Sequence, residues 1–193
     1  IMAFLARPIG GLEKLQSIEI TENFTAVFRV VLLAGLVLDS PVIFYEILAF
    51  ILPALKSNEK RILFTFLPLL ILFFIAGILF AFFILLPAAI PFLIFFTDIQ
   101  PTIRTSSYFS FTTNMLFWIG VVFEMPIFIY CLTKVKVVNS GLLLKKWRQA
   151  VVICAILAMR ITPTVDPFNM TILLIPLVLL YFLSSLFAKI AER

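Results

Sequence analysis

Three carboxylates lie within long apolar stretches of the sequence, where an ionised side chain would normally meet lipid. Glu124 lies in GVVFEMPIF, Glu46 lies in SPVIFYEILAF, and Asp39 comes shortly before Pro41. A charge near the centre of a bilayer costs about 3 kcal/mol or more on insertion scales, so each group must face protein or water or bind a proton. The sequence therefore indicates proton-binding, hydrogen-bonding or ligand-binding chemistry at these positions.

Two interpretations of Glu124 stay open at this point. In one, a protonated carboxyl makes a hydrogen bond that holds packed helices together. In the other, the side chain is a polar landmark on a concave, partly hydrated face that contacts a client or a partner helix. Pro126 loosens the local helix and frees backbone carbonyls, which favours a cavity-lining position.

Glu46 and Asp39 are seven residues apart, so they share one face of the same helix. Because of the cost of a charge in lipid, Glu46 and Asp39 cannot both face lipid. Glu46 lies close enough to the end of its helix to reach the lipid headgroups, so an interfacial role and a functional role remain open for it.

The composition indicates that lipid is the solvent of this chain. Of its 193 residues, 63% are hydrophobic and 13% are charged, and a soluble domain with this balance could not hydrate its surface. The chain has no His, and Cys131 and Cys154 lie in apolar stretches without CxxC spacing, so we expect buried free thiols and no metal site. Lys and Arg lie in short loops and form no basic face, which argues against nucleic-acid binding.

Five apolar spans predict an all-α, polytopic transmembrane protein made of one domain, residues 1–193, without an internal repeat. A membrane-spanning helix needs about 20 apolar residues, and the chain is long enough for several. The predicted spans are 24–55, 62–86, 108–133, 147–161 and 168–187.

Two of these spans have unusual lengths. A continuous helix over 62–96 would be about 50 Å long against about 30 Å of hydrocarbon, so we expect Pro87 and Pro91 to kink or end it near the outer surface. The span 147–161 reaches only about 22 Å. We expect local thinning of the bilayer beside it, or shielding by partner subunits.

The Lys and Arg residues predict the orientation. If the five spans alternate, ten of these residues lie on one side and four on the other, namely Arg7, Lys14, Arg104 and Arg160. By the positive-inside rule, the loops at 56–61 and 134–148 and the C-terminus are cytoplasmic. The N-terminal segment then lies outside, which predicts one further helix before it, with residues 1–5 as its outer end and 7–23 as an external loop.

Three separated motifs resemble the TatC family, the multispanning receptor subunit of the twin-arginine translocation system. They are SPVIFYEILAFILPALKSNEKR, SYFSF with GVVFEMPIFIYCL, and ITPTVDPFNMTILLIPLVLLY. The resemblance covers about residues 5–187. It implies a cupped, glove-like fold of six helices, five of them visible here, with both termini on the cytoplasmic side of the inner membrane or of an equivalent energy-transducing membrane.

The same resemblance implies a receptor that binds the twin-arginine signal peptides of folded precursor proteins. With single-span subunits of the TatA and TatB type, in an oligomeric complex, such a receptor exports these proteins with the proton-motive force. It implies no catalytic residue and no cofactor, and the sequence has no P-loop.

Glu59, in PALKSNEKR, matches the family carboxylate of the first cytoplasmic loop, which helps bind the two arginines. A carboxylate can accept both hydrogen bonds of a planar guanidinium, and Lys substitutes poorly for Arg in that geometry. Outside the resemblance, a Glu beside Lys and Arg is an ordinary solvated salt-bridge partner.

The resemblance implies roles for further residues. Glu124 matches the intramembrane carboxylate of the concave face, where Glu46 would add a second polar group. Asp166 matches an external acidic position. The residues that fall where the family contacts its single-span partners are Met159, Thr162 and Met170.

A rival hypothesis is a secondary transporter in which Glu124, Glu46 and Asp39 form a proton or cation relay. It would require discontinuous helices that meet at the midplane, and usually an internal repeat. A membrane scaffold without transport activity is a second rival.

Overall fold

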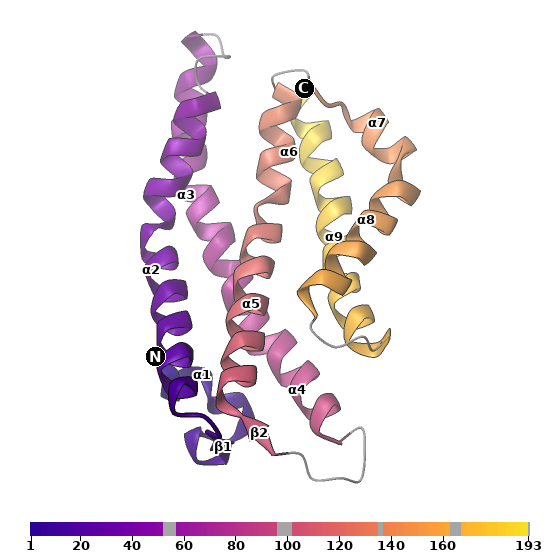
Figure 1. Ribbon diagram of the computed structural model, residues 1–193. Helices are drawn as coiled ribbons and strands as arrows, with labels where there is room; N and C mark the ends of the chain where they lie inside the picture. Colours follow the sequence, from indigo (N-terminus) through magenta and orange to yellow (C-terminus); the bar gives the residue numbers. More distant parts are fainter. Residues whose placement is uncertain (52–56, 96–101, 135–136, 163–166, 193) are drawn as a thin grey trace.

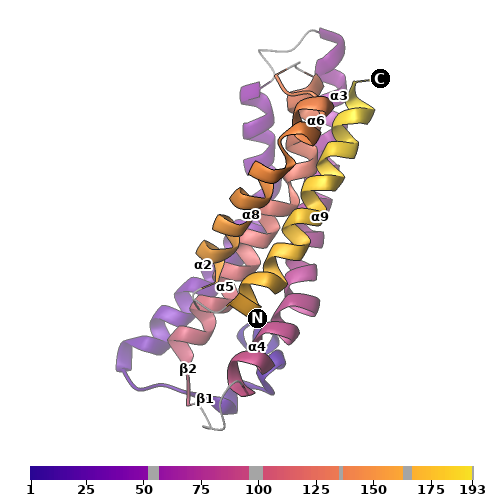
Figure 2. The same ribbon diagram turned by 90° about the vertical axis from the view of Figure 1, so that its right-hand side faces the viewer.

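The computed structural model describes residues 1–51, 57–95, 102–134, 137–162 and 167–192. Long helices lie side by side and account for nearly all of this part of the chain (Figures 1 and 2). Within the described ranges, four stretches are long and apolar enough to cross a membrane: Ile20–Phe50, Leu67–Phe92, Thr105–Lys134 and Met170–Ala191. The predicted all-α, polytopic membrane fold is confirmed.

The N-terminal segment is more ordered than the predicted external loop. It consists of α1 (Met2–Leu5), the 3-10 turns η1 (Arg7–Ile9) and η2 (Leu12–Lys14), and β1 (Leu15–Gln16). β1 pairs in parallel with β2 (Ile103–Arg104). The hydroxyl of Tyr108 also donates to the carbonyl of Leu5 at 2.7 Å.

The first span, α2 (Ile20–Ile51), begins before the predicted residue 24 because a polar network holds its first turn. The Glu22 carboxylate accepts a hydrogen bond from the backbone of Ile18 at 2.8 Å. It also accepts two from the Arg104 guanidinium, at 2.6 and 2.9 Å. This carboxylate raises the pKa of Arg104 and ties the start of α2 to β2.

The second span consists of α3 (Ser57–Phe80), a π-helical turn η4 (Ala81–Leu85) and α4 (Leu86–Phe95). Pro87 has no N–H to donate to the carbonyl four residues earlier, and the π turn ends two residues before it. The predicted disruption at the prolines therefore takes the form of a wider turn. The helix continues through Pro91 and ends at Phe95.

The third predicted span is two helices, α5 (Thr105–Phe123) and α6 (Met125–Lys134), which meet at Glu124. α6 begins at Met125, directly after Glu124. Pro126 is the second residue of α6, and a proline is well tolerated in the first turn of a helix. α2 and α3 pack on α5, whereas α6 packs on α9 (Pro167–Ala191).

Close packing between α3 and α5 depends on two glycines. A Cβ atom added to Gly77 would lie 2.8 Å from the Phe123 side chain and 3.1 Å from the backbone of Gly120. A Cβ atom added to Gly120 would lie 2.8 Å from the Phe74 ring. Small residues let transmembrane helices approach in this way.

The last part of the bundle is formed by α7 (Ser140–Lys145), α8 (Trp147–Ile161) and α9. α8 has the predicted bounds and is 15 residues long. It packs on α9, and α7 lies across the end of the bundle where α6 ends and the C-terminus lies (Figure 1). We call this end, which carries Lys134, Lys145, Lys146, Arg148 and Lys189, the basic end.

In the part of the chain whose side chains the structure describes, the buried side chains form two hydrophobic clusters. The larger one joins the N-terminal segment to η4, α4, α5, α8 and α9, and includes Phe82, Leu116 and Leu173. The smaller one joins α2, α3 and α6 through Phe44, Leu48, Leu70, Phe74, Ile127 and Cys131. Cys131 and Cys154 are buried free thiols, as expected.

Candidate functional site

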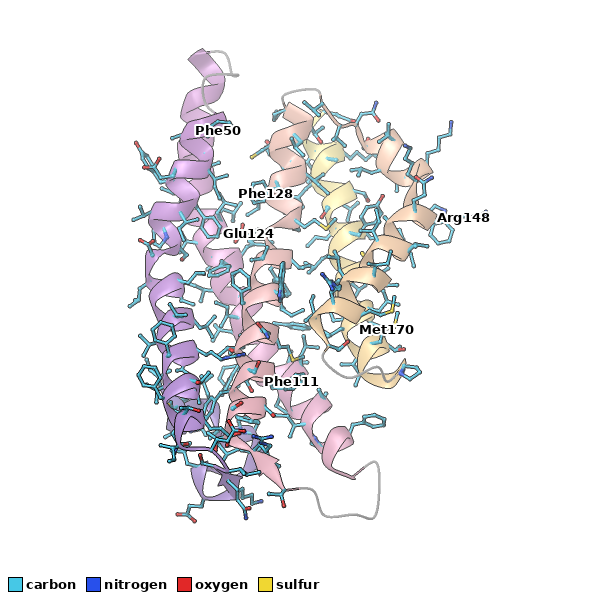
Figure 3. The ribbon with its side chains drawn as sticks, in the orientation of Figure 1. Phe50, Phe111, Glu124, Phe128, Arg148 and Met170 are labelled. Carbon is cyan, nitrogen blue, oxygen red and sulfur yellow. The ribbon has the colours of Figure 1, made fainter. Side chains whose placement is uncertain are left out.

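Glu124 lies at the joint between α5 and α6 and is 2% exposed. Its N–H donates to the carbonyl of Val121 at 3.2 Å, and its own carbonyl accepts from Ile127 and Phe128 at 3.1 Å. The backbone at the helix break is therefore well paired. Figure 3 shows Glu124 between α3 and the junction of α5 with α6.

The Glu124 side chain has no such pairing. Neither carboxyl oxygen has a hydrogen-bond partner among the residues that the structure describes. The helix-packing hydrogen bond, one of the two interpretations of this residue, has no partner in that part of the chain. A buried polar group left unpaired costs about 1–3 kcal/mol, and more when it is charged. This carboxyl group can therefore gain free energy from a proton, a water molecule or a polar ligand.

Glu46 and Asp39 lie on the exposed side of α2. Phe44 and Leu48 are buried at 7% and 5% exposure, and Glu46, midway between them in sequence, lies on the opposite side of the helix. The predicted common face of Glu46 and Asp39 is present. However, the structure does not bring either carboxylate to Glu124, so these three groups do not form the relay that the transporter hypothesis needs.

Glu59 lies in the first turn of α3, not in the loop where the sequence reading placed it. Ser57 and Asn58, at the start of α3, are residue types that favour helix N-termini. A carboxylate in the first turn is stabilised by the positive end of the helix dipole. The Glu59 side chain lies outside the described part of the structure.

The predicted partner-contact residues lie at the end of α8 and the start of α9. Met159 is 53% exposed, and Thr162 is buried and donates its hydroxyl to the carbonyl of Ala158 at 2.8 Å. Met170 is half-buried against the larger cluster (Figure 3). Of these side chains, Met159 is the most accessible to a partner. Asp166 lies outside the described residues.

One intramembrane cation, Arg29, is absent from the residues predicted from the sequence. Arg29 lies within the span of α2, is exposed, and donates a hydrogen bond to the Ser110 hydroxyl of α5. It lines a shallow groove of about 230 Å³ together with Asn114, Thr113 and apolar residues of both helices. Its signal in the sequence is a lone Arg within the apolar span 24–55, where a charge is costly unless it is paired.

The chain is similar to a well-defined group of proteins. The family model described as "Sec-independent protein translocase protein (TatC)" matches residues 1–176. A protein of that name from Carboxydothermus hydrogenoformans is 35% identical over 96% of this chain and 77% of its own length. The protein of that name from Aquifex aeolicus is 38% identical over 90% of this chain and 73% of its own.

A solved structure is similar throughout. The crystal structure titled "Twin Arginine Translocase Receptor- TatC" superposes with a TM-score of 0.85 at 35% identity, and the match covers 98% of this chain and 85% of that one. The family model, the relatives and the fold agree. The chain belongs to the TatC family of Sec-independent protein translocase proteins, and it is a multi-pass membrane component of protein transport and not an enzyme.

Proposed function

We propose that this chain is the receptor subunit of a twin-arginine protein translocase. It would bind the twin-arginine signal peptides of folded precursor proteins and export these proteins with the proton-motive force. The observation that supports this most strongly is the TM-score of 0.85 against a structure titled as the receptor of that system, over nearly the whole chain.

Glu59 is the residue to which we assign signal-peptide binding. Glu59 belongs to the first turn of α3, and α3 begins at the same end of the bundle as the C-terminus (Figure 1), which supports this assignment. The guanidinium groups of two adjacent arginines bind well to carboxylate acceptors, and a helix N-terminus favours negatively charged side chains. Glu124, buried without a partner among the described residues, is a second polar contact for a peptide or helix that enters the bundle.

The basic end of the bundle is the cytoplasmic side in this proposal. The cations that lie there are Lys134, Lys145, Lys146, Arg148 and Lys189, and α3 begins at the same end (Figure 1), which agrees with the positive-inside rule. The C-terminus is then cytoplasmic, and the membrane is the cytoplasmic membrane or an equivalent energy-transducing membrane.

We assign contact with single-span subunits of the TatA and TatB type to the end of α8. Met159 is exposed there, and the side chains before it, Ile153, Ile156 and Leu157, are also exposed and apolar. Thr162 is buried and Met170 is partly buried, so in this proposal they pack behind the exposed side chains and do not contact the partner directly. A partner helix packed along α8 would cover these apolar side chains. The external acidic role that the resemblance implies for Asp166 is part of the same proposal.

A binding measurement with a twin-arginine peptide tests the central assignment. In the full-length protein, Glu59→Ala removes the acceptor of charge-assisted hydrogen bonds worth about 1.5–3 kcal/mol, so we expect affinity to fall by about 10- to 100-fold. Glu13→Ala, at the opposite end of the molecule, is the matched control and should bind normally. Undiminished affinity in the Glu59 variant would show that the assignment is wrong.

A further inference from the structure

A pocket of about 760 Å³ lies at the basic end, between α7 and the start of α8. Three cations line it, and its described lining contains no carboxylate. The lining residues are Asn139, Gly141, Leu142, Lys145, Lys146, Arg148 and Gln149. A cavity with this charge and amide groups at its rim suits a phosphate group.

The wall formed by α7 is held in place at three points. The Asn139 side chain accepts the N–H of Leu142 at 2.7 Å, and the Tyr181 hydroxyl of α9 donates to the carbonyl of Leu143 at 2.7 Å. The backbone and hydroxyl of Ser140 both donate to the Glu192 carboxylate. These bonds lower the pKa of Glu192, so it stays ionised and tied to α7 at neutral pH.

Exposed apolar side chains lie beside the pocket. Leu142 and Leu144 are 48% and 51% exposed on α7, and Trp147 is 45% exposed at the first position of α8. The Arg148 guanidinium lies 5.7 Å from the centre of the Trp147 ring, and Figure 3 shows Arg148 on the outer side of α8. Trp and basic residues with exposed apolar neighbours are typical of the membrane interface.

We propose that this pocket binds the phosphate headgroup of an anionic phospholipid from the adjoining leaflet. The lysines and Arg148 would hold the phosphate, and the lipid tail would pass over the exposed leucines beside Trp147. A free phosphate ion could use the cations and not the apolar surface, which is why we assign the site to a lipid. The proposal is independent of the receptor role.

Trp147 is a built-in reporter for the test. With Trp118→Phe as the background, Trp147 is the remaining tryptophan of the chain. The protein is reconstituted in vesicles of phosphatidylcholine containing equal fractions of brominated phosphatidylglycerol or brominated phosphatidylcholine. Because bromine quenches nearby tryptophan, the ratio of the two signals gives a relative association constant for the anionic lipid.

In the protein with both lysines, we expect this association constant to exceed one. Each of Lys145→Gln and Lys146→Gln should lower it by about fivefold, or to one where it is smaller than five. Lys189→Gln, an exposed cation at the same end that does not line the pocket, is the matched control and should leave it unchanged. Equal quenching by the two lipids, or a double variant that keeps the preference, would overturn the proposal. Loss of the preference on adding inorganic phosphate at constant ionic strength would also overturn it, because the site would then take the free ion.

Discussion

Glu124 is a carboxyl group that the fold buries without a hydrogen-bond partner among the described residues. The sequence placed it within a span, but it left the hydrogen-bonded and the ligand-facing interpretations open. The structure adds that Glu124 lies at the joint between α5 and α6 and that its side chain is buried there. An unpaired buried carboxyl group lowers the stability of the fold, and this is why we propose a functional role for Glu124.

Replacing Glu124 separates these roles. Glu124→Leu removes a buried unpaired polar group, so thermal stability in detergent should stay level or rise, by about 1–3 kcal/mol. Glu124→Gln keeps the shape and loses the ionisable group. We expect both variants to lower export per folded molecule, about tenfold for each 1.4 kcal/mol of lost interaction. Normal export with reduced stability would mean that Glu124 acts only in packing.

At the level of helices and strands, some bounds could be predicted from the sequence and others could not. The bounds of α8 could be predicted, because Lys146 and Pro163 mark its two ends in the sequence. The start of α3 could not, because the polar and charged residues at 57–61 are typical of a loop and also of a helix N-terminus. The β1–β2 pair joins residues that are far apart in sequence, and two-residue strands leave no periodic signal.

The contact between α3 and α5 should be intolerant of added volume. Gly77→Ala places a Cβ atom against the Phe123 side chain and the Gly120 backbone, so we expect a loss of about 1–3 kcal/mol in the free energy of unfolding. Gly35→Ala in α2 is the control. Its Cβ atom meets nothing within 4 Å, and the higher helix propensity of Ala should leave stability unchanged or raise it by up to about 1 kcal/mol. Equal effects on thermal unfolding would contradict this packing.

The short α8 should matter to transport through its length. At 15 residues it spans about 22 Å, less than the hydrocarbon thickness, so the bilayer beside it must thin or be shielded. Inserting one helical turn of apolar residues after Ile156 should lower export while the protein still inserts. Exchanging Ile156 for Leu keeps the length and is the control. Export that persists with the longer helix would argue against a role for thinning.

At the scale of the whole molecule, composition and span pattern were enough to predict a polytopic helical membrane protein. The motifs were enough to indicate its family. The orientation, the further helix before Ile1 and the glove-like arrangement of six helices stay predictions. What the sequence could not show was the side-chain environment: Arg29 against Ser110, and Glu46 on the face of α2 opposite Phe44. Such contacts depend on how helices rotate about their axes.

Crosslinking of a labelled twin-arginine precursor to the start of α3 tests the central claim most directly. With a photoreactive residue at Asn58 of the full-length protein in membranes, we predict crosslinks to the signal peptide that are lost when its two arginines become lysines. A photoreactive residue at Glu13, at the opposite end, should give none. No crosslink at Asn58, or an equal yield from the two-lysine precursor, would contradict a twin-arginine receptor.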